Sequence, residues 1–379
     1  MKKRLLSVFA IAVMTVSMLA GCGSSTDKSA DTNNNNAATT EETGDKLKVS
    51  LLVTGSFGDK AFNDSAQEGM EKIKAELSDK CDVEMIEMGN DKTKFEGSLL
   101  DASDSDADVI IVGTWDMKEI LETVAPQYPD KKYIIFDTDV DYSLGLENVY
   151  SMSYKQNEAA FLAGVLAAGV TTSDMEFANE EAKIGFIGAK DTAAVINDSA
   201  VGYIEGAKFM NPDIKVLVSY VGSYTDSATA KELALTQYSN GADCVFVAAG
   251  PASVGVIEAG AESQKYVIGV DSDQALAYEG KEEANYIISS AIKGVGISLY
   301  NSIEKDLEGE LPYGTYEQLG LKEGAVGLAE NEIYTSTVPE DIRANVDAAE
   351  EKILNGEVTV STAYGMDEAT LDGIINSVQ

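Results

Sequence analysis

The chain has 379 residues, of which 44% are hydrophobic, and a formal net charge of −36 at pH 7. This excess of negative charge repels phosphates, so it argues against nucleic acid as a partner and against direct adsorption to anionic lipid. The chain has no histidine, which excludes Ser-His-Asp and Cys-His catalysis and histidine-ligated zinc. The length predicts two globular domains rather than one core.

The N-terminus has the three parts of a secretory signal. Basic residues at positions 2–4 precede an apolar run from Leu5 to Leu19, and Cys22 follows two small residues. The apolar run is shorter than the roughly 20 residues that a membrane-spanning helix needs. The arrangement looks like a bacterial lipobox, so we interpret residues 1–21 as a lipoprotein signal peptide and Cys22 as the lipidated residue, with palmitate as one of its acyl chains. The alternative is an ordinary signal peptide followed by an incidental cysteine.

A polar segment follows Cys22. Residues 22–45 consist mainly of Ser, Thr, Asn and Asp, including four consecutive asparagines from Asn33 to Asn36. Such a composition buries too little apolar surface to offset the entropy of ordering. We therefore expect a flexible linker that holds a domain away from the membrane surface, although a poorly ordered N-terminus without a role is the alternative.

From Leu47 onward, short apolar runs alternate with amphipathic stretches. The nearly continuous apolar runs are typical of parallel strands that are covered on both faces. We predict strands at Leu47–Val53, Val83–Met88, Asp108–Gly113, Lys132–Phe136, Val149–Met152, Lys183–Ile187, Ile214–Tyr220, Asp243–Ala248, Tyr266–Val270 and Tyr286–Ser289.

Helical periodicity lies between these runs. Phe62, Ala66, Met70, Ile73 and Leu77 recur at spacings of three and four, which places them on one apolar helix face. Further helices are predicted at Glu158–Gly169, Ala200–Phe209, Ser227–Tyr238, Ser253–Glu262, Val295–Leu307 and Pro339–Leu354. This alternation indicates an α/β fold with doubly wound parallel sheets.

The strand–helix series runs twice, and the second series begins near Lys183. It predicts two lobes joined by a hinge, with the ligand at the carboxyl ends of the strands. We expect residues 46–155 and about 275–320 in the first lobe, and residues 156–274 and about 321–379 in the second.

The loop after the first strand holds two aromatic residues, Phe57 and Phe62, near the strand end. Either ring could contact a ligand, but Phe62 also fits the apolar face of the following helix, so burial beneath the loop is the alternative. Asn63 or Asp64 is predicted to cap a helix that begins near Ser65.

The sequence predicts no metal site and no cofactor. Asp137, Asp139 and Asp141 suggest a calcium loop, but Tyr142 and Asn148 stand where an EF-hand needs Gly and Glu. Cys81 and Cys244 could form a disulfide in an external compartment. We expect them instead to be unpaired, because they fall in different predicted lobes.

Several segments resemble the basic membrane protein family, lipoproteins similar to the purine nucleoside receptor that serve as substrate-binding subunits of ABC importers. The loop from Asp59 to Asn63 reads Asp-Lys-Ala-Phe-Asn, close to the family's Asp-Lys-Ser-Phe-Asn. Further matches follow in the family's order at residues 161–168, 211–216, 220–226, 248–250 and 268–274. The resemblance covers nearly all of the chain from Leu47 to Val358.

The resemblance implies a type I periplasmic-binding-protein fold, whose two lobes close on a ligand. In nucleoside-binding members two aromatic rings sandwich the base, and Phe62 and Tyr224 match them. An acidic residue and a lysine hold the ribose hydroxyls, and Asp271 and Lys293 match these. The chemistry is suitable, since a carboxylate accepts hydrogen bonds from hydroxyls and an ammonium donates to them. The alternatives are an Asx turn at Asp271 and a surface position for Lys293.

Other residues in or beside the matching segments complete the candidate ligand-binding set, namely Phe57, Asp59, Asn63, Gly250 and Asp273.

The sequence also departs from the family's pattern. Val53, with Thr54 beside it, replaces an acidic residue that reads the purine edge, and Ser199 replaces an aromatic residue. Trp115 is the single tryptophan; it could form another stacking wall or belong to the interface between lobes. Asp116 could accept a hydrogen bond from a base edge.

We therefore expect a non-enzymatic, extracytoplasmic solute-binding lipoprotein, lipid-anchored to the cell membrane, that captures a nucleoside, with a purine nucleoside favoured. It would deliver its ligand as a monomer to separate ABC permease and ATPase subunits. One alternative is a surface receptor that senses a small sugar-like or nucleoside ligand. The other is a nucleoside hydrolase that uses clustered carboxylates.

Overall fold

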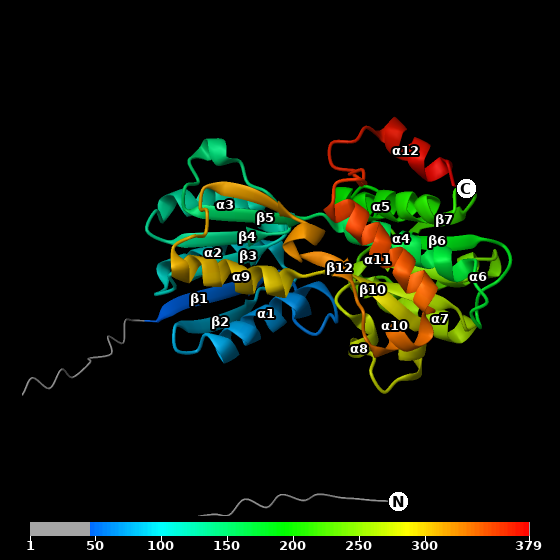
Figure 1. The fold of residues 1–379 in the computed structure, drawn as a ribbon. Helices are drawn as coiled ribbons and strands as arrows, with labels where there is room; N and C mark the ends of the chain where they lie inside the picture. The colour runs from blue at the N-terminus through cyan, green and yellow to red at the C-terminus, as the bar shows by residue number, and fades with distance from the viewer. Residues whose placement is uncertain (1–45, 379) are drawn as a thin grey trace, which may run out of the picture. The chain divides into compact units, whose positions relative to one another are not determined.

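The computed structural model describes residues 46–378 (Figure 1). The predicted signal peptide, Cys22 and the linker lie outside the described residues. Within residues 46–378, no helix is both long and apolar enough to cross a membrane.

The described chain forms two six-stranded sheets, one in each of two lobes. The first has the order β11-β5-β4-β3-β1-β2, and each adjacent pair is parallel. Its strands are β1 (Leu47–Val53), β2 (Cys81–Glu87), β3 (Val109–Gly113), β4 (Lys132–Phe136), β5 (Val149–Tyr154) and β11 (Thr315–Leu319).

The second sheet has the order β12-β10-β9-β8-β6-β7, and only β12 runs antiparallel to its neighbour. Its strands are β6 (Lys183–Gly188), β7 (Lys215–Tyr220), β8 (Cys244–Ala248), β9 (Tyr266–Asp271), β10 (Ile287–Lys293) and β12 (Val326–Leu328). The chain therefore passes between the lobes after β5, after β10 and after β11.

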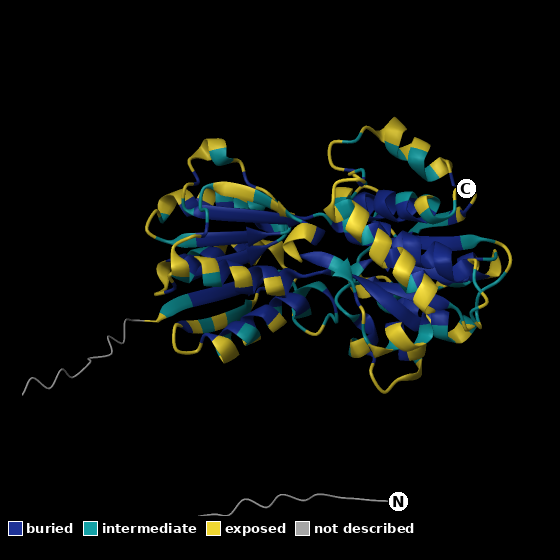
Figure 2. Ribbon diagram, viewed as in Figure 1, coloured by how far each residue is buried: buried dark blue, intermediate teal, exposed yellow. Residues whose placement is uncertain are grey.

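Helices cover both faces of the sheets, so the central strands are buried along their whole length (Figure 2). Strand β3 reads Val-Ile-Ile-Val-Gly, the β-branched composition expected of a strand that packs on both faces. The helices are α1 (Phe62–Glu76), α2 (Phe95–Asp104), α3 (Lys118–Val124), α4 (Gln156–Thr171), α5 (Ala194–Met210), α6 (Ser227–Ser239), α7 (Ser253–Ser263), α8 (Gln274–Ala277), α9 (Val295–Glu308), α10 (Glu332–Thr337), α11 (Glu340–Leu354) and α12 (Glu368–Asn376).

The predicted strands β1 and β4 have the observed bounds, and the other predicted strands begin close to the observed ones. The predicted fold class is confirmed by the two parallel-dominated sheets. Strands β11 and β12 were not predicted, because β11 is a polar, partly exposed edge strand and β12 is only three residues long.

The observed lobes differ from the predicted boundaries at one place. Residues 275–293 were assigned to the first lobe, but β10 pairs with β9 and so belongs to the second sheet. The chain has returned to the first lobe by Gly296, whose backbone meets Ser65 and Gly69 of α1, and α9 packs against α1. Cys81 and Cys244 are both buried and free, and they lie in different sheets.

Glycines allow helices α4 and α5 to pack with their backbones in close contact. A Cβ at Gly202 would lie 2.2 Å from the carbonyl oxygen of Asn157, and one at Gly206 would lie 1.9 Å from that of Phe161. Both distances are far below van der Waals contact. The start of α4, at Asn157 and Phe161, therefore lies against Gly202 and Gly206 in the middle and C-terminal part of α5.

We predict that Gly206→Ala destabilises the protein by about 1–3 kcal/mol or more, because the added methyl forces the α4 and α5 backbones apart. The measurement is the free energy of unfolding from urea titration. The matched control is Gly97→Ala on α2, where a Cβ would meet nothing within 4 Å. That exposed helical site should gain about 0.5–1 kcal/mol. Equal stabilities for the two variants would contradict the close helix contact.

Candidate functional site

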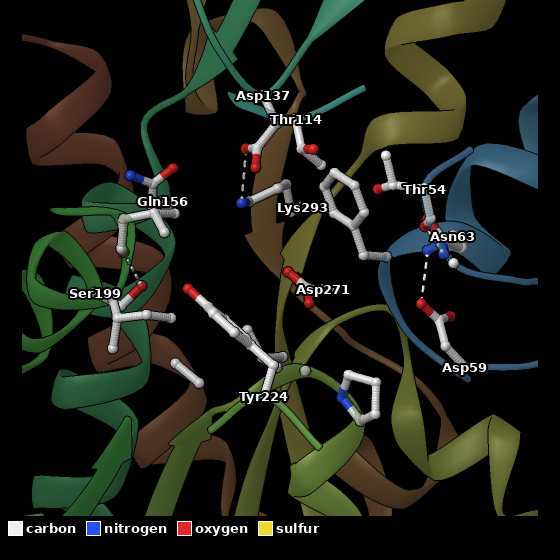
Figure 3. A pocket seen from close by; sticks show the side chains of 18 of the residues that line it. Thr54, Asp59, Asn63, Thr114, Asp137, Gln156, Ser199, Tyr224, Asp271 and Lys293 are labelled. Atoms are coloured by element: carbon white, nitrogen blue, oxygen red, sulfur yellow. Dashed lines mark hydrogen bonds and ion pairs between the residues drawn. The ribbon is translucent and has the colours of Figure 1, made fainter. Parts of the chain in front are cut away.

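A cavity of about 410 Å³ lies at the carboxyl ends of the strands of both sheets. This size is within the range of about 300–1,000 Å³ for small-molecule sites. Figure 3 shows side chains of both lobes directed toward it. The predicted site residues that line it are Asp59, Phe62, Asn63, Trp115, Asp116, Tyr224, Gly250, Asp271 and Lys293.

The loop between β1 and α1 is held in place by Asp59. Its carboxylate accepts hydrogen bonds from the backbone N–H groups of Asn63 at 2.9 Å and Asp64 at 3.2 Å, the second and third residues of α1. The predicted helix start near Ser65 with an Asn63 or Asp64 cap is therefore wrong. Asp59 fills the capping role because its carboxylate reaches the free amides at the positive end of the helix.

Asn63 also fixes this loop from within. Its side-chain nitrogen donates to the carbonyl oxygens of Thr54 at 3.0 Å and Ser56 at 3.1 Å. The polar groups of Asp59 and Asn63 are thus largely occupied by the protein itself, and their main effect is to place the neighbouring Phe62 at the cavity.

Three charged side chains from both lobes meet at the cavity (Figure 3). The Lys293 ammonium donates to Asp137 at 2.9 Å, and the Lys293 and Asp137 side chains are only 8% and 17% exposed. Burial alone would lower the pKa of Lys293, but the charges of Asp137 and Asp271 outweigh burial and raise it. The lysine is therefore charged, and it is not at the surface as the alternative reading had it.

Asp271 has the opposite character. Its pKa is raised from 3.8 to about 6, mainly by burial; the Lys293 ammonium opposes this rise, and the charges of Asp137 and Asp59 add to it. Within residues 46–378 no hydrogen-bond donor contacts its carboxylate, whereas Asp137 is paired with Lys293. Asp271 is thus the carboxylate of the cluster that is best placed to accept hydrogen bonds from a ligand.

Backbone strain is concentrated at the same strand ends. Thr114 after β3, Asp137 after β4 and Asp271 at the end of β9 have φ angles of 71°, 63° and 67°. A left-handed backbone costs about 1–3 kcal/mol for residues other than glycine and persists where the surrounding structure imposes it. All three residues line the cavity, so the strain serves to aim side chains into it.

Phe62 and Tyr224 are two of the aromatic residues that line the cavity, and they come from different lobes. Phe62 is partly exposed to the cavity while its ring centre lies 5.6 Å from that of Phe136. Phe62 therefore combines the two roles considered from the sequence, because it packs on the core and also lines the cavity. Tyr224 lines the opposite lobe, and Figure 3 shows its side chain extending into the cavity.

Trp115 lies at the exposed margin of the cavity. The residue is 71% exposed, and the Lys92 ammonium lies 4.9 Å from the centre of its ring. Lys92 also forms an ion pair with Asp116 at 2.6 Å. Because Asp116 already has this partner, it is a poorer acceptor for a ligand than the sequence suggested.

Two predicted site residues do not line the cavity. Phe57 is partly buried and packs against the hydrophobic core. Asp273 accepts two hydrogen bonds from the Asn331 side chain, at 2.8 and 2.9 Å, and caps α8. In this structure Asp273 therefore stabilises the loop between β9 and α8.

The sequence analysis did not select Asp137, Thr114 or Gln156 as ligand-binding residues, although all three line the cavity. Asp137 directly follows a buried strand, which was an available signal. Gln156 had no such signal. Asp139 pairs with Lys118 at 2.8 Å and Asp141 caps a short 3₁₀ helix. Within residues 46–378, no cluster of three or more Asp, Glu or Cys side chains could hold a metal ion.

Lys60, in the β1–α1 loop, connects the two lobes. Its ammonium donates to the carbonyl oxygen of Ala277 at 3.1 Å and lies 4.2 Å from the centre of the Tyr278 ring. The Ser272 hydroxyl donates in return to the carbonyl oxygen of Lys60 at 2.8 Å. The loop that carries Phe62 is thus tied to the second-lobe loop that carries Asp271.

Two α/β lobes with three crossings between them, and a cavity at the facing strand ends, define the class of ABC solute-binding proteins. A solved ABC transporter solute-binding protein from Aeropyrum pernix K1 is similar, with a TM-score of 0.74 and 28% identity over 88% of this chain and 97% of that chain. The chain belongs to the family of PnrA-like ABC transporter substrate-binding proteins (Bmp), which it matches over residues 46–363.

Curated relatives agree with this assignment. Basic membrane protein A1 of Borrelia garinii subsp. bavariensis is 32% identical over 83% of this chain and 88% of its own length. A protein of Lactococcus lactis subsp. cremoris named ABC transporter nucleoside-binding protein BmpA is 30% identical over 95% of this chain and 99% of its own length. The family resemblance inferred from the sequence is therefore confirmed.

Asp271 should make the free energy of unfolding of the ligand-free protein decrease as the pH rises. Between pH 3.8 and about 6 the folded protein retains a proton that the unfolded chain has released. The contribution of this carboxyl to the free energy of unfolding therefore falls as the pH rises through that window, by up to about 3 kcal/mol. Asp271→Asn stays neutral, so the variant should gain stability relative to wild type between about pH 4 and pH 7. Urea titrations of wild type and Asp271→Asn at about pH 4 and pH 7 measure this difference. The same change in stability with pH in both proteins would contradict the prediction.

Proposed function

We propose that this protein is an extracytoplasmic, lipid-anchored solute-binding protein that captures a nucleoside, with purine nucleosides preferred, and delivers it to an ABC importer. The observation that carries the proposal is the pairing of two features in one cavity. Aromatic side chains of both lobes line it, and a charged cluster of Asp271, Lys293 and Asp137 lies beside them.

These features suit the two halves of a nucleoside. A flat base buries its faces against aromatic rings, and each such contact adds about 0.5–1.5 kcal/mol beyond the burial of area. A ribose carries adjacent hydroxyls that donate to a carboxylate such as Asp271 and accept from an ammonium such as Lys293. The name of the Lactococcus relative, a nucleoside-binding protein, supports the same ligand class.

Binding across two lobes also suits delivery to a transporter. Lobe closure around a ligand gives the loaded protein a surface that differs from that of the empty protein. The loops that carry Phe62 and Asp271 come from different lobes and are already in contact through Lys60. Ligand binding in the cavity would therefore change the position of one lobe relative to the other.

The ligand prediction is tested by a thermal-shift screen with purine and pyrimidine nucleosides, free bases and pentoses. A nucleoside present at 100 times its Kd should stabilise the folded protein by about 2.7 kcal/mol. Phe62→Leu retains apolar contact with Phe136 but loses the ring, so we expect its Kd to rise about 2- to 10-fold. Phe57→Leu, in the same loop but outside the cavity, is the matched control and should leave the Kd unchanged.

Stabilisation by pentoses alone would exclude the base-stacking role of Phe62, and the absence of stabilisation by any nucleoside would exclude the proposed ligand class. The screen also includes an assay for free base released from inosine. Release of base would favour a hydrolase over a binding protein.

The membrane anchor is tested separately through Cys22. We predict that Cys22→Ser abolishes lipidation and moves the protein from the membrane fraction to the medium or the periplasm, because a serine hydroxyl does not accept the lipid that the thiol carries. Fractionation followed by immunoblotting measures this. Cys244→Ser is the matched control and should remain with the membrane. A Cys22→Ser protein that stays membrane-bound would contradict lipid anchoring.

A further inference from the structure

Gln156 occupies an unusual position in the cavity. It is the first residue of α4, directly after the first crossing between lobes, and it is only 7% exposed while lining the cavity. Figure 3 shows it close to the Asp137–Lys293 pair. Residues of α4 and α5 that also line the cavity include Ala159, Ile196 and Ser199.

The orientation of the Gln156 amide is fixed by Asp198. The amide nitrogen donates to one carboxylate oxygen of Asp198, a fully buried residue on α5. The other carboxylate oxygen accepts from the Thr362 hydroxyl at 2.6 Å and from the Ala363 N–H at 2.8 Å. A carboxylate surrounded by donors can accept only the nitrogen end of an amide, so the Gln156 oxygen must face the other way.

The second neighbour of Gln156 is consistent with that orientation. Tyr364 follows Thr362 and Ala363 in the C-terminal segment. Burial raises the pKa of its phenol to about 12, and hydrogen bonding from the Gln156 side chain opposes this rise. The amide nitrogen is thus engaged by Asp198. The amide oxygen is buried and has no hydrogen-bond partner among the described residues.

We propose that the Gln156 side-chain oxygen accepts a hydrogen bond from a hydroxyl of the bound nucleoside's sugar, next to the hydroxyl that Asp271 holds, and so determines specificity for ribose. This inference rests on the proposed function. A buried acceptor without a partner is costly, and a ligand hydroxyl removes that cost. An analogue without the hydroxyl leaves the oxygen unpaired, so the site rejects it.

The sugar is assigned to this region by proximity. Gln156 lies beside the Asp137–Lys293 pair (Figure 3), and Lys293 belongs to the cluster proposed to bind the ribose. Adjacent ribose hydroxyls can be held by more than one acceptor, each from its own direction. Asp271, from β9 of the second lobe, provides one and Gln156, from the start of α4, provides the other.

The test measures the Kd of guanosine or inosine, whichever binds, and of its 2′-deoxy and 3′-deoxy forms. Wild type should prefer the ribonucleoside about tenfold or more over each deoxy form. In Gln156→Met, which has a similar volume but no amide oxygen, the preference over one of the two deoxy forms should fall to about twofold or less, while the other persists. Gln318→Met, on exposed β11, is the matched control and should retain both preferences.

Gln156→Glu keeps a side-chain oxygen at this position and should retain both preferences even if its proximity to Asp198 lowers stability. Loss of a preference in Gln156→Glu, or retention of both in Gln156→Met, would overturn the inference. A fall in melting temperature of Gln156→Met with unchanged preferences would show that the residue only supports Asp198, and would overturn the inference alone. Failure of wild type to bind any nucleoside in the thermal-shift screen would overturn the proposed function as well.

Discussion

The buried ion pair between Lys293 and Asp137 is the interaction on which the rest of the site depends. Lys293 is the last residue of β10, at the point where the chain leaves the second sheet, and Asp137 follows β4 of the first sheet. A buried charge must be compensated, so neither residue can be separated from the other without a large penalty. The pair therefore determines how the second crossing is placed relative to the first lobe. It also leaves Asp271 as the carboxylate that faces the cavity without a fixed partner.

Around this pair the protein uses its own polar groups to position other side chains. Asp59 satisfies the N-terminus of α1, Asn63 ties the loop to the end of β1, and Asp198 orients Gln156. In each case a residue that could contact a ligand by its chemical type acts instead through a neighbour. This explains why acidic residues are so common at the strand ends while few of them are available as acceptors. The acidic composition of the chain therefore gives no measure of how many carboxylates a ligand would meet.

The α4–α5 contact links the helical packing to the chemistry of the cavity. Glycines at positions 202 and 206 let the two helices approach until the start of α4 lies against the middle of α5. That approach brings Gln156 within hydrogen-bond distance of Asp198, and the C-terminal segment around Thr362 and Ala363 closes the arrangement from outside. Asp198 and the C-terminal segment, more than 150 positions apart in the sequence, thus together fix the orientation of the Gln156 amide. The hydrogen bond between Gln156 and Asp198 depends on this close packing of α4 against α5.

The sequence by itself determined the fold class, most of the strands and the family, because buried parallel strands leave continuous apolar runs and the β1–α1 loop retains a recognisable order of residues. It also selected Phe62, Tyr224, Asp271 and Lys293, all of which line one cavity. The tertiary structure decided which polar residues are available. It turned Asp273 toward Asn331, paired Asp116 with Lys92, and placed β10 in the second sheet. It also brought Asp137 and Gln156 to the cavity. These outcomes depend on partners that are distant in sequence, and local pattern carries no information about which distant group will satisfy a given donor or acceptor.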